Sequence, residues 1–123
     1  MAARLILAVD AEAAVRQSLI DVLSLDGYEV DGASDADSAL LLLDQRRYDL
    51  VIADVRMPDL DGPGLLAALA ERFGDAPPQV VFLTWGTFDP HYGSFLANLH
   101  APVLTKPLKP GRVLDLVGRV LAS

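Results

Sequence analysis

The chain has 123 residues, enough for one domain with a substantial core and too few for two. It contains no cysteine, which excludes disulfides, thiolate metal sites and a cysteine nucleophile, and favours a reducing compartment. The net charge of -7, with only 10 Lys and Arg, argues against direct nucleic-acid binding. No apolar segment approaches membrane-spanning length, so we expect a cytoplasmic protein without membrane contact.

Five short runs with strand character alternate with segments of helical spacing. The runs cover residues 5–9, 28–33, the stretch that ends on Asp54, 79–84 and 102–105. The run before Asp54 is rich in Val and Ile and is bounded by turn residues, which is typical of a strand buried on both faces of a parallel sheet. The carboxyl end of such a strand is where these sheets place their functional groups.

Helices are predicted between these strands from the spacing of apolar residues. Ser34 is the expected N-cap of the second helix, and Pro63 is the expected first residue of the third. Asp89 and Pro90 are expected to start the fourth helix, which Gly93 weakens by about 1 kcal/mol relative to Ala. The inward-facing positions are Val15, Leu19, Val22 and Leu23; Ala36, Ala39, Leu40 and Leu43; Leu65, Leu66 and Leu69; Tyr92, Phe95 and Leu99; and Val113, Leu114, Val117, Val120 and Leu121.

Alternating strands and helices imply right-handed crossovers onto a parallel sheet covered on both faces. We therefore predict one α/β domain over residues 1–123, with a flavodoxin-like, doubly wound (βα)5 fold and strand order 2-1-3-4-5. In that order the crevice opens between strands 1 and 3, beside Asp10 and Asp54. Thr84 and Lys106, at the ends of strands 4 and 5, are expected on its rim.

Motifs at these strand ends carry a family resemblance. They are Val9-Asp10-Ala11-Glu12, the turn from Asp54 to Gly62 with Met57-Pro58 and Asp61-Gly62, Leu83-Thr84, and Thr105-Lys106-Pro107. Any one of them alone would be weak support. Because they occur in order and at matching element ends, the chain resembles the receiver domain of two-component response regulators over essentially its whole length.

The resemblance implies a reaction and a role for each of these residues. A receiver domain takes a phosphoryl group from a phosphohistidine of a sensor kinase onto the Asp at the end of the third strand, here Asp54. Lys106 would contact one phosphate oxygen, and the Thr84 hydroxyl would bond another as the switch step. Asp10, Asp54 and the backbone carbonyl of Arg56 would hold Mg²⁺, which offsets the charge of the phosphoryl oxygens.

Three positions depart from the family pattern. Ala11 stands where a second acidic residue usually binds the cation, so Mg²⁺ binding should weaken, with Glu12 as a partial substitute of uncertain geometry. Val103 replaces the Tyr or Phe whose ring changes position on activation. Trp85 replaces a small residue, and it either restricts access to Asp54 or lies outward against Phe88.

Each site residue also has an ordinary structural interpretation. Asp10 could cap the first helix, Asp54 could be a turn residue, Thr84 could be a β-branched strand end, and Lys106 could be a solvated surface lysine. Their co-occurrence at four strand ends favours the functional interpretation. His91 and His100 lack metal-ligand spacing and are expected to be surface or cap residues, and Asp59 and Asp61 are expected to shape the turn.

We therefore expect a signalling domain and not an enzyme, phosphorylated by a sensor histidine kinase or phosphotransfer protein and coupled to an output domain or a downstream protein. The alternative is a pseudo-receiver, a phosphorylation-independent interaction module, which Ala11 and Val103 favour. A flavin carrier is a third class, poorly supported because the turn at Asp10 lacks Gly, Ser or Thr donors. The final helix offers a homodimer surface, although core packing alone explains its apolar stripe.

Overall fold

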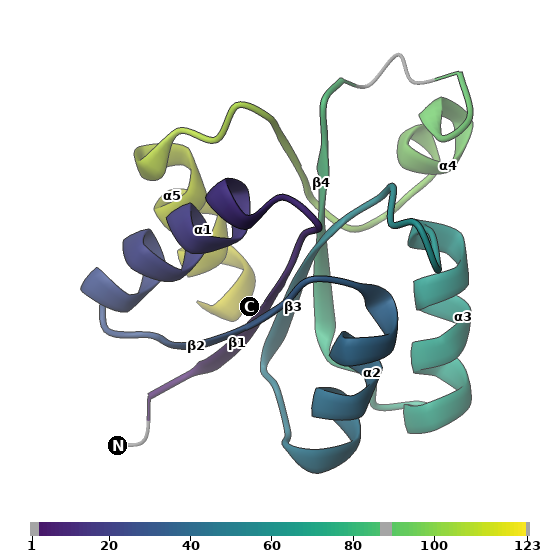
Figure 1. Cartoon of the computed structure of the whole chain (residues 1–123), viewed down its shortest axis with the longest axis horizontal. Helices are drawn as coiled ribbons and strands as arrows, with labels where there is room; N and C mark the ends of the chain where they lie inside the picture. Colours follow the sequence, from purple (N-terminus) through teal and green to yellow (C-terminus); the bar gives the residue numbers. More distant parts are fainter. Residues whose placement is uncertain (1–2, 87–89, 123) are drawn as a thin grey trace.

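The computed structural model describes residues 3–86 and 90–122, which form a five-stranded sheet with helices on both faces (Figure 1). All strand pairs are parallel and the order is β2-β1-β3-β4-β5, so the predicted fold class and strand order are confirmed. The strands are β1 (Leu5–Val9), β2 (Glu29–Ala33), β3 (Leu50–Asp54), β4 (Gln79–Thr84) and β5 (Val103–Thr105). The helices are α1 (Ala13–Leu25), α2 (Ala36–Gln45), α3 (Gly62–Phe73), α4 (Gly93–Ala97) and α5 (Pro110–Ala122).

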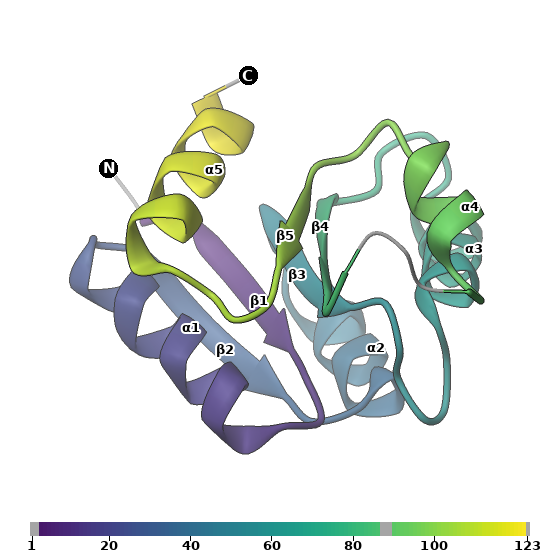
Figure 2. The ribbon, with the colours of Figure 1, turned by 90° about the horizontal axis from the view of Figure 1, so that it is seen from above.

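The sheet separates two apolar cores. Helices α1 and α5 pack on one face, and α2, α3 and α4 lie on the other, as the view from above shows (Figure 2). Residues of β1 and β3 alternate between the cores: Leu7 and Val51 join one, while Ile6 and Ile52 join the other. Burial on both faces explains why these strands are continuously apolar in sequence. None of the helices in the described ranges is both long enough and apolar enough to cross a membrane.

Two helix starts differ from the prediction. Asp35, not Ser34, is the N-cap of α2, because its carboxylate accepts the backbone N–H of Ser38. Helix α3 begins one residue before Pro63, at Gly62, and Asp61 caps it by accepting the N–H of Gly64 at 3.0 Å. In both cases a carboxylate on a residue in extended conformation bonds the third residue beyond it, which is the usual N-cap geometry.

Helix α4 is shorter than predicted. It runs only from Gly93 to Ala97, so Tyr92 is its N-cap residue and Leu99 lies beyond its end. Pro90 lies in a turn ahead of it, and the expected cap at Asp89 lies outside the described residues. The Tyr92 hydroxyl donates a hydrogen bond to Asp61 at 3.1 Å, and Gly93 is a poor helix former. Both features favour a late start to this helix.

The loop after β3 is held closely against the sheet. The Gly62 N–H donates to the Val55 carbonyl at 2.8 Å, which closes the loop that follows Asp54. A Cβ atom at position 62 would lie 2.8 Å from Val55 Cγ2 and 3.1 Å from a ring carbon of Phe82. Glycine is therefore required here by space, and the tight loop keeps Asp54 at the edge of the sheet.

Candidate functional site

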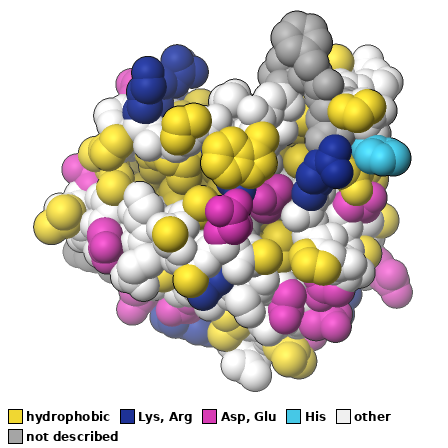
Figure 3. Space-filling view, turned by 45° about the horizontal axis from the view of Figure 1, so that its top comes forward, with side chains coloured by type: hydrophobic (Ala, Val, Ile, Leu, Met, Phe, Trp, Pro, Cys, Tyr) yellow, Lys and Arg dark blue, Asp and Glu magenta, His cyan; other side chains and the backbone are white. Residues whose placement is uncertain are grey.

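The predicted site residues converge at the carboxyl edge of the sheet. The strand register places Val9 beside Ala53 and Thr84 beside Thr105, so the residues that follow these pairs meet at one edge. Asp10, Asp54 and Thr84 line one cavity of about 480 Å³ there. On this face, acidic side chains gather beneath a group of hydrophobic ones, with basic side chains on either side (Figure 3).

Lys106 joins the two carboxylates. Its Nζ lies 2.6 Å from Asp54 Oδ2 and 2.8 Å from Asp10 Oδ2, with Glu12 Oε1 at 3.6 Å. Only 1% of the Lys106 side chain is exposed. Burial alone would lower the pKa of Lys106, but its contacts with Asp10 and Asp54 outweigh burial and raise that pKa above its usual value. The interpretation of Lys106 as a solvated surface lysine is therefore wrong.

Asp10 is fully buried and anchored by its neighbours. Its Oδ1 accepts the backbone N–H of Glu12 at 2.9 Å, and Arg16 donates to its backbone carbonyl at 2.6 Å. Its Oδ2 contacts Lys106 at ion-pair distance but makes no hydrogen bond of acceptable geometry. A buried carboxylate oxygen with this incomplete coordination fits a hard cation, which prefers oxygen ligands.

Asp54 is held from both sides and remains accessible. Its Oδ1 accepts the Arg56 N–H at 2.8 Å, its Oδ2 contacts Lys106, and 13% of its side chain is exposed to the cavity. The turn geometry at Arg56 that supplies this N–H also keeps the Arg56 backbone beside the carboxylate. The arrangement presents a nucleophilic carboxylate beside a fixed positive charge.

The Thr84 side chain is bonded within its own loop. Its hydroxyl donates to the Gly86 carbonyl at 2.8 Å and accepts the Gly86 N–H at 3.2 Å, and the residue is 2% exposed. Thr84 therefore lines the cavity with Asp54, but its hydroxyl is hydrogen-bonded to the backbone of Gly86. Contact with a group on Asp54 would require these two bonds to be exchanged.

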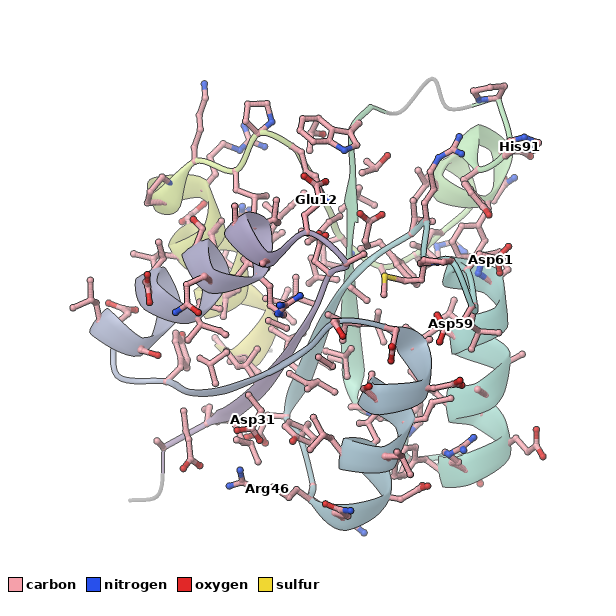
Figure 4. All side chains as sticks on the ribbon, viewed as in Figure 1. Glu12, Asp31, Arg46, Asp59, Asp61 and His91 are labelled. Carbon is pink, nitrogen blue, oxygen red and sulfur yellow. The ribbon has the colours of Figure 1, made fainter. Side chains whose placement is uncertain are left out.

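The first strand end supplies only part of an acidic cation site. Ala11 is exposed at the cavity, and the side chain of Glu12, 53% exposed, extends above the site toward Lys106 (Figure 4). Within the described part of the chain, no three His, Cys, Asp or Glu side chains form a group that could hold a metal. The predicted metal set of Asp10, Asp54 and the Arg56 carbonyl has only two carboxylates, so it falls outside that criterion and stays a prediction.

Trp85 lies over Lys106. The Nζ is 5.4 Å from the centroid of the indole ring, and the side chain borders the same cavity as Asp54. The predicted contact with Phe88 lies outside the described residues, and restricted access to Asp54 stays a prediction; the indole is 61% exposed where it borders the cavity. Val103 is half-buried against the α2, α3 and α4 core and presents no ring to that face.

Sequence reasoning missed the roles of two side chains beside the site. Asp59 does more than shape the turn, because its carboxylate accepts the backbone N–H groups of Ala36 and Asp37 at the start of α2 (Figure 4). Tyr92 borders the cavity, bonds Asp61, and lies with its ring 5.2 Å from the Arg56 guanidinium carbon. Neither contact has a local sequence signal, since each joins residues more than twenty positions apart.

The remaining candidates lie away from the carboxylates. His91 lies at the outer edge near α4 and His100 is exposed, in line with their predicted surface positions (Figure 4). A cluster of Arg46, Asp31 and Glu29 lies at the other end of β2, with Arg46 bonding Asp31 at 2.8 Å and Glu29 at 3.1 Å. This cluster links α2 to the edge strand and does not reach the cavity.

Comparison with known proteins gives a consistent result. Residues 6–118 match the family described as the response regulator receiver domain. The response regulator protein FleR of Pseudomonas aeruginosa is 36% identical over 119 residues, which cover 97% of this chain and 24% of FleR. The response regulator MprA of Mycobacterium leprae is 43% identical over 76 residues, 62% of this chain and 33% of MprA.

Solved structures share the whole fold. The chemotaxis protein CheY4 of Vibrio cholerae, crystallised at low pH, superposes with a TM-score of 0.85 at 31% identity, covering 97% of this chain and 99% of that one. The receiver domain of NtrX from Brucella abortus gives a TM-score of 0.81 at 29% identity, covering 96% and 98%. By contrast, the chain spans only about a quarter to a third of the curated relatives named above.

Proposed function

This chain belongs to the family of response regulator receiver domains, whose function is phosphoryl acceptance in two-component signalling, and we propose that Asp54 is its phosphoacceptor. The observation that carries the proposal is the ion pair between Asp54 Oδ2 and the buried Lys106 Nζ at 2.6 Å, where Asp54 lines a cavity at the carboxyl edge of the sheet. It supports the proposal because a carboxylate nucleophile and a buried cation lie together beside that cavity.

The proposed reaction transfers a phosphoryl group between two side chains. A carboxylate oxygen of Asp54 attacks the phosphorus of a phosphohistidine, and an O–P bond forms as the P–N bond breaks. The electron pair of the broken bond stays on the imidazole nitrogen, and Asp54 becomes an acyl phosphate. Because the transferred group carries its charge on its outer oxygens, catalysis depends on positioning and on positive charge.

Lys106 and Thr84 supply the fixed contacts to the new group. The Lys106 ammonium lies within contact of Asp54, so it can follow a phosphoryl oxygen once the carboxylate charge is consumed. The Thr84 hydroxyl leaves Gly86 and turns inward to bond a second oxygen. That inward movement is the proposed switch. Val103 offers no ring to relay it, so the outer face responds differently from receivers that carry an aromatic residue there.

Receiver domains generally bind Mg²⁺ at an acidic site. Here Asp10, Asp54 and the Arg56 carbonyl would hold it, and when bound it would offset the negative charge of the phosphoryl oxygens. The buried Oδ2 of Asp10, whose contact is the ion pair with Lys106, supports this assignment. Ala11 removes one carboxylate, so affinity is weakened, and Glu12, 3.6 Å from Lys106, is placed to compensate only in part.

The proposed partners follow from the family and from the relatives, which are longer than this chain. The donor is a sensor histidine kinase or a phosphotransfer protein, and the receiver acts on an output domain or a separate protein. The negative net charge of -7 supports neither DNA nor RNA as a direct ligand of this domain.

The test is a mass measurement after incubation with acetyl phosphate and Mg²⁺. We expect one phosphoryl group to be added, and Asp54→Asn to abolish the addition. Asp59→Asn is the matched control, because it removes a carboxylate from the same loop and should leave the adduct in place. Absence of an adduct on the parent chain, with acetyl phosphate and with a cognate kinase alike, would replace this proposal by the pseudo-receiver.

A further inference from the structure

Trp85 is an unusual surface residue. Its side chain is 61% exposed, and among the described residues only Leu25 and Leu41 are comparably exposed large hydrophobic residues. Neither of those borders the cavity of Asp54, whereas Trp85 does. An exposed indole at the mouth of a charged site is therefore the feature that requires an explanation.

The indole separates two hollows. On one side it borders the cavity that contains Asp54 and Asp10. On the other it borders a shallow groove formed by Val15 and Ser18 of α1 and by Pro107. Lys106 contributes to the lining of the groove but not to that of the cavity, and its ammonium lies 5.4 Å from the ring centroid. The lysine side chain is nevertheless only 1% exposed, so the ring and the carboxylates enclose it.

We propose that Trp85 is a positioning residue for Lys106: its indole face holds the ammonium against Asp54 and shields it from water. A cation within about 6 Å of an aromatic face is attracted by the ring quadrupole, most strongly for Trp. Excluding water from the ammonium also lowers the local dielectric and strengthens its attraction to Asp54 and Asp10. Trp85 thus acts on the site through Lys106 and touches no reacting atom.

The position of Trp85 also affects how a phosphodonor approaches Asp54, a consequence that rests on the proposed function. Because Trp85 covers Lys106, a donor reaches Asp54 through the cavity that Trp85 shares with Arg56, Met57 and Pro58. Lys106 is already aimed at Asp54 before the donor arrives. A small residue at position 85 would open the Lys106 side and leave the ammonium mobile.

The composition of the chain provides a direct assay. It has only two lysines, the enclosed Lys106 and the exposed Lys109, so Lys109 serves as an internal reference for amine labelling. The parent, Trp85→Ala, Trp85→Phe and Leu41→Ala are treated briefly with an amine-acylating reagent, and the Lys106 to Lys109 ratio is measured by peptide mass spectrometry. Leu41 is the matched control, because at 62% exposure it is as accessible as Trp85 but lies on α2.

We expect Trp85→Ala to raise the labelling ratio about tenfold, the factor that corresponds to a partly desolvated cation–π contact. Trp85→Phe keeps an aromatic face and should stay within about threefold of the parent, and Leu41→Ala should not change the ratio. An unchanged ratio in Trp85→Ala would overturn the proposal, as would equal increases in Trp85→Phe and Trp85→Ala. Thermal unfolding of each variant establishes that the labelled protein is folded.

A second readout uses the indole itself, which belongs to the only tryptophan of the chain. Lys106→Met removes the ammonium from the ring face and should change the emission intensity, whereas Lys109→Met should not. Identical spectra for both variants and the parent would contradict the contact. Neither assay contains a phosphodonor, so a failure here is distinguishable from a failure of Asp54 to accept a phosphoryl group.

Discussion

Asp59 fastens the loop after β3 to the start of α2, because its Oδ2 accepts the backbone N–H of Asp37 at 2.9 Å and its Oδ1 accepts that of Ala36 at 3.1 Å. The two N–H groups belong to the first turn of α2, where helix N–H groups lack partners within the helix. The loop that follows Asp54 is therefore tied to α2, the helix that connects β2 to β3.

We predict that Asp59→Ala lowers the free energy of unfolding by about 0.5–1 kcal/mol, in the range for loss of a helix-capping carboxylate. The hydrogen bond from Asp37, only partly opposed by desolvation, lowers the pKa of Asp59 below 3.8. A carboxyl group with a depressed folded-state pKa stabilises the protein above its unfolded pKa and loses this effect as the pH falls through the folded value. The difference between Asp59→Ala and the parent should therefore be present at pH 7 and shrink below pH 3.8.

Urea unfolding at a series of pH values measures this difference. Asp75→Ala is the control, since it removes an exposed carboxylate beyond the end of α3. A pH-independent difference for Asp59→Ala would show that the carboxylate charge is not what holds α2.

Lys106→Met should destabilise the domain by about 2–4 kcal/mol, because it leaves the buried Asp10 carboxylate and the adjacent Asp54 without their shared cation. Mg²⁺ should recover part of the loss, so the Mg²⁺-dependent rise in Tm should be larger in this variant than in the parent. Lys109→Met, at an exposed position, should stay within about 0.5 kcal/mol of the parent. Equal Mg²⁺ shifts in both lysine variants would argue against a cation site at Asp10.

Ala11→Asp should tighten Mg²⁺ binding roughly tenfold, because it adds a carboxylate to a site of low ligand count. The emission of Trp85 during a Mg²⁺ titration reports the change, since this ring borders the cavity. Ala13→Asp adds the same charge at the start of α1 and serves as the control for long-range electrostatics. An unchanged titration for Ala11→Asp would mean that position 11 does not limit the cation site.

Gly62→Ala should lower the free energy of unfolding by about 1–3 kcal/mol, because the new Cβ would lie 2.8 Å from Val55 Cγ2 in the closed loop. Gly118→Ala is the matched comparison. It lies within α5 and a Cβ there meets nothing within 4 Å, so it should stabilise the protein by about 0.5–1 kcal/mol. Urea unfolding should therefore move the two midpoints in opposite directions, and a shift of both in one direction would contradict the steric account.

The features that depend on local pattern were predictable from the sequence. Strand β3 ends on Asp54 as expected, and the order of the parallel strands follows from right-handed crossovers, so the meeting of Asp10 and Asp54 at one edge was predictable as well. The identity of the α2 cap was not, because Ser34 and Asp35 are both good capping residues and only the backbone conformation selects between them.

The features that depend on side-chain direction were not predictable. The sequence placed Trp85 beside the acceptor but left its orientation open, since nothing local turns the indole toward Lys106 instead of outward. The long-range bond of Asp59 and the short α4 have the same cause, because each depends on residues far away in the chain. Tertiary contacts decide such details.

The two hydrogen bonds between Thr84 and Gly86 oppose an inward turn of the Thr84 hydroxyl. The Thr84 hydroxyl both donates to and accepts from the backbone of Gly86, which stabilises its present orientation. Turning the hydroxyl inward breaks both bonds and leaves the Gly86 carbonyl and N–H in need of new partners. Losing these bonds costs about 0.5–1.5 kcal/mol each. For Thr84 to act as the proposed switch, a phosphoryl oxygen has to offer the hydroxyl a stronger acceptor than the carbonyl it leaves.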